Sequence, residues 1–180
     1  MAEYEKSGTT LLSLESERPV SDFDLIAFSI SFEPDFVNIP KILRLARVPV
    51  FASDRSGQTP LVLAGGAACF INPEPASLLF DMIAIGEGEA ILPPLTTFLL
   101  AQAQLSRPDL LNAAKSIPGI YIPSFNLSQP VSRICPAEHH KAEPVTSVVL
   151  TDETEFGNMY LVEVSRGCPR GCRFCAAGFV

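Results

Sequence analysis

Three cysteines near the end of the sequence, Cys168, Cys172 and Cys175, are spaced as C-x-x-x-C-x-x-C. Three thiolates can hold three irons of a cubane iron–sulfur cluster and leave the fourth iron open for another ligand. The sequence has five cysteines, an odd number, and these three lie within eight positions of one another. Such clustering favours metal or redox chemistry over a disulfide framework.

The residues around the cysteines suit a metal-binding loop. Gly167, Pro169 and Gly171 let the backbone wrap closely around a cluster, because glycine tolerates unusual dihedral angles and proline rigidifies a loop. Positive charge favours thiolate over thiol. It is supplied here by Arg166, Arg170 and Arg173.

Other roles for the three cysteines agree less well with the sequence. A structural zinc site needs four ligands, and Cys135, His139 and His140 lie 28 to 33 residues upstream at no recognisable spacing. A ferredoxin-type site would need a fourth cysteine nearby, and flanks rich in Gly, Pro and Arg do not pack a core. The spacing therefore favours an iron–sulfur cluster with one open iron.

These cysteines, with aromatic Phe174 just before the last of them, resemble the signature of the radical S-adenosylmethionine (SAM) superfamily. The resemblance extends to residues 162–167 in front and 176–178 behind. It implies a 4Fe–4S cluster on the three cysteines, with SAM chelating the fourth iron, and cleavage of SAM to methionine and a 5′-deoxyadenosyl radical. It also implies that Phe174 lies near the SAM adenine.

The elements in front of this segment alternate between strands and helices, which predicts an α/β fold with a parallel sheet and flanking helices. Pro40, Pro93 and Pro94 are expected near first turns of helices, where proline is least harmful. Apolar runs predict strands at residues 24–30, 60–64 and 82–85, and amphipathic stretches predict helices at 36–47, 73–80 and 90–104.

This front part resembles the cobalamin-binding-type Rossmann domain that precedes the radical SAM barrel in one branch of the superfamily. It is most similar to an uncharacterised group there, the Fe–S oxidoreductases. Ligands of open parallel sheets bind beyond the carboxyl ends of the strands, where three matching loops fall. The candidate cofactor-binding residues in these loops are Ser29, Ser31, Gly65, Gly66, Gly86, Glu87 and Gly88.

A purely structural interpretation of these loops stays open. The Gly65–Gly66 pair can be a tight turn, and Glu87 and Glu89 can be favourable acidic residues at a helix start. The D-x-H-x-x-G motif that binds cobalt in some cobalamin proteins is absent from the sequence. Cobalamin therefore stays open as a cofactor and is not predicted.

The composition limits which classes of binding partner we expect. The net charge of −7 provides no electrostatic footprint for nucleic acid or an anionic membrane. No apolar run approaches the roughly 20 residues of a membrane span, and the polar start does not resemble a secretory signal. We expect a soluble, cytoplasmic protein whose cluster receives electrons from a reductant of the flavodoxin or ferredoxin type.

Three segments are expected along the chain: a cobalamin-binding-like domain at 1–115 without its first strand–helix unit, a Pro-rich connector at 116–158, and the start of a radical SAM domain at 159–180. A barrel of this kind usually needs about 200 residues, so we expect a fragment that is inactive alone. Its strand at 159–164 would lack its barrel neighbours. Residues after about Met159 should then be poorly ordered or paired differently from a barrel strand.

The leading hypothesis is a fragment of a radical SAM Fe–S oxidoreductase. The alternative is a non-catalytic ligand-binding or interaction module whose cysteines hold a structural zinc or iron–sulfur site. No feature of the sequence indicates the substrate.

Overall fold

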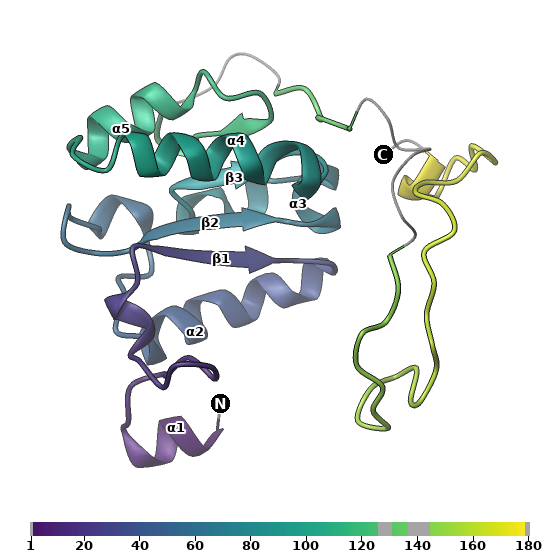
Figure 1. Ribbon diagram of the computed structural model, residues 1–180, viewed down its shortest axis with the longest axis horizontal. Helices are drawn as coiled ribbons and strands as arrows, with labels where there is room; N and C mark the ends of the chain where they lie inside the picture. The colour runs from purple at the N-terminus through teal and green to yellow at the C-terminus, as the bar shows by residue number, and fades with distance from the viewer. Residues whose placement is uncertain (1, 126–130, 137–144, 179–180) are drawn as a thin grey trace. The chain divides into compact units, whose positions relative to one another are not determined.

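The computed structural model describes residues 2–125, 131–136 and 145–178 (Figure 1). It divides into two compact units, residues 1–136 and 137–180. We call the first the sheet unit and the second the cysteine unit. In the described residues every helix is too short or too polar to cross a membrane.

The sheet unit is built on four strands in the order β1-β2-β3-β4. The first three are parallel, with Leu25 of β1 opposite Leu61 of β2, and β4 runs antiparallel to β3. The predicted α/β fold with a mostly parallel sheet is thus confirmed. The strands are β1 (Leu25–Ser29), β2 (Leu61–Gly65), β3 (Met82–Ala84) and β4 (Ile120–Tyr121).

Helices flank the sheet on both sides, with α4 and α5 on one side and α2 on the other (Figure 1). Short 3-10 helices connect them: η1 (Val20–Asp22), η2 (Glu33–Asn38), η3 (Ala52–Asp54), η4 (Glu74–Leu79) and η5 (Pro123–Phe125). The α-helices are α1 (Ala2–Ser7), α2 (Ile39–Leu45), α3 (Ala67–Ile71), α4 (Gly88–Ala101) and α5 (Arg107–Ala114).

The central strands β2 and β3 are apolar on both faces because both of their faces are covered. Side chains alternate along a strand, so neighbouring residues enter different cores. Val62 and Ile83 pack in a cluster with residues of α2 and α3. Leu63 and Met82 pack in a second cluster with residues of α4 and α5. Each fully buried aliphatic side chain contributes about 1.5–3 kcal/mol to stability.

Several predicted helices differ from the structure. The segment predicted as one helix at 36–47 is divided between η2 and α2, and the helix predicted at 73–80 is the 3-10 helix η4. Pro93 and Pro94 lie inside α4, beyond its first turn, because α4 begins at Gly88. Burial of Ile91 and Leu95 on the sheet holds α4 together despite the lost backbone donors.

The sequence prediction missed α5, although its start carries a recognisable signal. Ser106 is the N-cap, its hydroxyl accepts a hydrogen bond from the Asp109 amide, and Pro108 lies in the first turn. The unit also extends past the boundary expected at residue 115. It does so because β4 completes the sheet and Ile134 packs against the second core cluster.

The cysteine unit contains a loose hairpin in front of the cysteines. Thr146 and Val162 form an antiparallel bridge, and the Ser147 amide donates to the Leu161 carbonyl at 2.9 Å. The regular strand predicted at 159–164 is therefore wrong for the described residues, because only one bridge forms there. The antiparallel pairing agrees with the expectation that this segment pairs differently from a barrel strand.

Candidate functional site

The cysteine loop closes on itself. Gly167 and Gly171 adopt positive φ angles of 75° and 57°, and the Cys175 amide donates to the Cys172 carbonyl at 3.0 Å. The loop ends in η7 (Ala176–Gly178), and a Cβ built on Gly178 would lie 3.1 Å from the Cα of Gly171. The backbone therefore keeps the three cysteines in one small loop.

The three thiols of this loop are at least partly accessible to solvent, but they do not converge on a common point. Cys168 is exposed, Cys172 and Cys175 are half-buried, and all three are free. Within the described ranges, no three Cys, His, Asp or Glu side chains converge as metal ligands. Metal ligands commonly reach their final geometry only when the metal binds. Three soft thiolates on a closed loop fit the donor set of an iron–sulfur cluster with one open iron.

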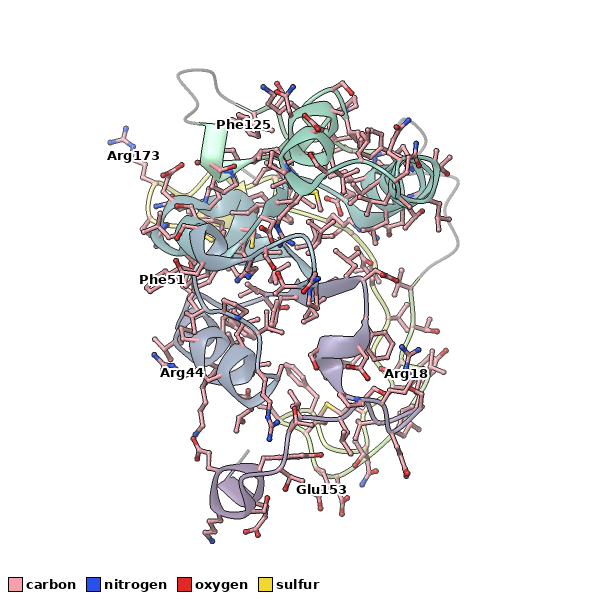
Figure 2. All side chains as sticks on the ribbon, turned by 90° about the vertical axis from the view of Figure 1, so that its left-hand side faces the viewer. Arg18, Arg44, Phe51, Phe125, Glu153 and Arg173 are labelled. Carbon is pink, nitrogen blue, oxygen red and sulfur yellow. The ribbon has the colours of Figure 1, made fainter. Side chains whose placement is uncertain are left out.

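The arginines of the loop differ in their surroundings. Arg166 donates to the Glu163 carboxylate, so its charge is compensated locally. Arg170 and Arg173 are exposed, and Figure 2 shows the Arg173 side chain extending outward. Phe174 is 92% exposed, which leaves its ring free to contact a ligand. The positive charge exposed beside the cysteines therefore comes mainly from Arg170 and Arg173.

The loop after β1 meets the loop after β2 through backbone contacts. The Ile30 amide donates to the Gly65 carbonyl at 2.8 Å, and the Ala68 amide donates to the Ile30 carbonyl at 3.1 Å. Gly66 has φ 97°, and a Cβ there would lie 2.5 Å from the Ile30 carbonyl oxygen. Glycine is required at 66 by the chain's own backbone. Ser29 and Ser31 flank buried Ile30 and are exposed.

The loop after β3 is covered by residues 131–136, which we call the strap. The Ile134 amide donates to the Ile85 carbonyl at 3.0 Å, and the Glu87 amide donates to the Ile134 carbonyl at 2.8 Å. Gly86 has φ 137°, and a Cβ there would lie 2.6 Å from the Ile134 nitrogen and closer still to its carbonyl oxygen. Gly88 only begins α4.

Arg133 holds the strap to the same edge. Its guanidinium donates to the Glu87 carboxylate and lies 5.1 Å from the centre of the Phe70 ring, a cation–π contact. Sequence analysis missed the strap, because a single apolar Ile134 in a proline-rich stretch carries no periodic signal. The structure therefore brings Ser29, Ser31, Gly65 and Gly66 together, and covers Gly86 and Glu87.

Two cavities lie at the amino ends of strands β1 to β3, away from the glycine loops at the carboxyl ends. One, of about 810 Å³, is lined by Phe51, Leu111 and Tyr121 among others. The Tyr121 hydroxyl donates to the Glu74 carboxylate, and burial, followed by the effect of Glu74, raises the pKa of Tyr121 to about 12. The other cavity, of about 460 Å³, is lined by Leu25, Leu99 and other residues. Sequence analysis predicted neither cavity.

Comparison with known proteins decides the family. A family model described as radical SAM proteins, N-terminal, matches residues 1–123. The chain belongs to this radical SAM N-terminal family. The match covers the sheet unit up to residue 123 and ends before the strap and the cysteine loop.

One relative of this radical SAM chain is the uncharacterised protein MJ0966 of Methanocaldococcus jannaschii. The two are 25% identical over 177 residues, which is 98% of this chain and 35% of the relative. The chain thus spans about a third of the length of that protein. No solved structure matches the chain.

Proposed function

We propose that this chain is the cluster-binding part of a radical SAM enzyme, in which Cys168, Cys172 and Cys175 hold a 4Fe–4S cluster. The observation that carries the proposal is the C-x-x-x-C-x-x-C spacing on a loop that closes through Gly178, in a chain of the radical SAM family. When bound, such a cluster supplies the electron that cleaves SAM into methionine and a 5′-deoxyadenosyl radical, which abstracts hydrogen from a substrate.

The chain's own residues have distinct parts in this proposal. The three thiolates bind iron, while Gly167 and Gly171 allow the backbone to turn around it. Phe174, which is 92% exposed, packs on the adenine of SAM. Because all five cysteines are free, the chain suits a reducing compartment such as the cytoplasm.

The charge around the cysteine loop supports an acidic protein as the reductant. Arg170 and Arg173 are exposed beside the cysteines of a chain whose net charge is −7. A small positive surface beside a cluster attracts an acidic electron donor of the flavodoxin or ferredoxin type. Arg166 contributes less because Glu163 neutralises it.

The sheet unit is, in this proposal, the Rossmann-like domain that precedes the barrel. Its parallel strands and flanking helices support that assignment. Ser29, Ser31 and Gly65 remain the candidates for contacting a small ligand, since Ser29 and Ser31 are exposed and Gly65 is half-buried. The radical SAM domain would begin near residue 159.

Anaerobic reconstitution of the chain with iron and sulfide, followed by electron paramagnetic resonance, tests the proposal. The expected result is a reduced 4Fe–4S signal that changes when SAM is added. Cys172→Ala should abolish the signal, and Cys135→Ala, an exposed cysteine outside the loop, should leave it unchanged. A signal that survives Cys172→Ala, or stoichiometric zinc in place of iron, would contradict the proposal.

A further inference from the structure

Part of the carboxyl edge of the sheet, the loop after β3, is already occupied by the chain itself. In open α/β sheets this edge is where a ligand contacts glycine-rich loops. Here the backbone of Ile30 lies against Gly66 and the backbone of Ile134 lies against Gly86. Each glycine thus makes room for the protein's own main chain.

A bulky corrinoid cofactor therefore does not fit the residues present. The loop after β3, where such a cofactor would need access, carries the strap with hydrogen bonds on both sides of Ile134. Two cavities, of about 810 and 460 Å³, open at the amino ends of the strands. Their linings include none of the seven carboxyl-edge candidates of the sequence.

Side chains also anchor the strap to the sheet unit. The Ile134 side chain packs in the second core cluster and fills the space beside Gly119, where a Cβ would lie 2.8 Å from the Cγ1 of Ile134. Val131 packs against the first core cluster. The strap therefore contributes to both cores, and the Arg133–Glu87 ion pair joins it to the start of α4.

We propose that the strap permanently covers the loop after β3, which leaves no room for cobalamin at that loop. The sheet unit then anchors the connector that follows the strap. The unit then serves to hold that connector at a defined residue, Ile134, and only the loops after β1 and β2, where Ser29 and Ser31 are exposed, stay open to a smaller ligand. This inference does not depend on cluster binding by the cysteine loop.

Two measurements on the full chain test this proposal. Titration with hydroxocobalamin, followed by visible absorbance, should show no binding at micromolar concentrations. Hydrogen exchange should be slow at the amides of Glu87 and Ile134, since both donate hydrogen bonds between the strap and the loop after β3. Stoichiometric cobalamin binding, or exchange at Ile134 as fast as at exposed Gly57, would overturn the proposal.

Variants show whether the strap is held as described. Gly86→Ala places a methyl group against the Ile134 backbone and should release the strap, so that both amides exchange rapidly. Arg133→Ala, which introduces no backbone clash, should speed exchange at Ile134 by on the order of tenfold. Gly57→Ala is the matched control, because nothing lies within 4 Å of its added Cβ. Unchanged exchange in Arg133→Ala as well as in Gly86→Ala would refute the anchoring role of the strap.

Discussion

The carboxylate of Asp81 accepts a hydrogen bond from Arg55 at 2.9 Å, with 2% and 0% of the two side chains exposed. Arg107 reaches the same carboxylate oxygen at 2.8 Å, and the Val62 amide donates to it at 2.7 Å. Arg55 also donates to the carbonyls of Pro49, Val50 and Leu79. Asp81 thus joins the segments before β2, before β3 and at the start of α5.

Removal of this carboxylate should destabilise the sheet unit strongly. Asp81→Ala leaves two buried guanidinium groups without their counter-charge, which costs about 3–5 kcal/mol in the free energy of unfolding. Burial already lowers the pKa of Arg55, and Asp81 opposes that effect. Urea denaturation measures the change, with exposed Asp35→Asn as a control expected to shift by less than about 0.5 kcal/mol. A decrease below about 1 kcal/mol in the free energy of unfolding for Asp81→Ala would show that the ion pairs of Asp81 with Arg55 and Arg107 do not stabilise the fold.

Tyr121 should make the stability of the sheet unit decrease at alkaline pH. Burial, and then Glu74, raises its pKa to about 12 from an ordinary value of 10.0. The unfolded chain therefore loses this proton first, and the stabilisation present below pH 10 is lost as the pH rises towards 12. Urea midpoints measured from pH 8 to 11.5 should fall less steeply for Tyr121→Phe than for the wild type. Tyr160→Phe, at an exposed tyrosine, should keep the wild-type slope; equal slopes for all three would contradict the prediction.

The five thiols should divide into two kinetic classes. Cys69 is 1% exposed in α3, and burial raises its pKa to about 11, so at pH 8 it is a protonated and covered thiol. Ellman's reagent should react quickly with four cysteines of the metal-free chain, and with the fifth only when urea is added. Cys69→Ala should remove the slow phase and leave the fast amplitude unchanged. Five fast thiols in the wild type would be inconsistent with the core described for α3.

Charge beside the cysteine loop should govern the encounter with an acidic reductant. The double variant Arg170→Glu/Arg173→Glu should associate with an acidic flavodoxin-type protein about tenfold more slowly at low salt. The difference should disappear near 1 M salt, where the Debye length is about 3 Å. Stopped-flow reduction of the reconstituted chain measures this.

Two controls complete that experiment. Arg44→Glu changes an exposed arginine on α2 (Figure 2) and should leave the association rate unchanged. Dithionite, a small reductant, should reduce wild type and double variant equally, which shows that the cluster itself is intact. Equal rates with the protein donor at low salt would remove Arg170 and Arg173 from the docking surface.

The sequence by itself was sufficient for features that depend on neighbouring residues. Short apolar runs predicted β1, β2 and β3, and the reason is clearest in β2 and β3, because a strand buried on both faces must be apolar throughout. The apolar stretch after Gly88 predicted α4 for the same kind of local reason. The spacing of Cys168, Cys172 and Cys175 keeps them in one loop, since the chain between them is too short to separate them widely. Metal binding by this loop stays a prediction.

The tertiary structure alone decided what distant residues do to one another. In the sequence, Gly66 could contact a cofactor or form a tight turn, and Gly86 could contact a cofactor or precede a helix start. Only the folded chain places the backbones of Ile30 and Ile134 against them. Asp81 is 26 residues from both Arg55 and Arg107, so no local pattern relates them. Such contacts form because packing brings separate segments together, and sequence periodicity reports only which side of an element is buried.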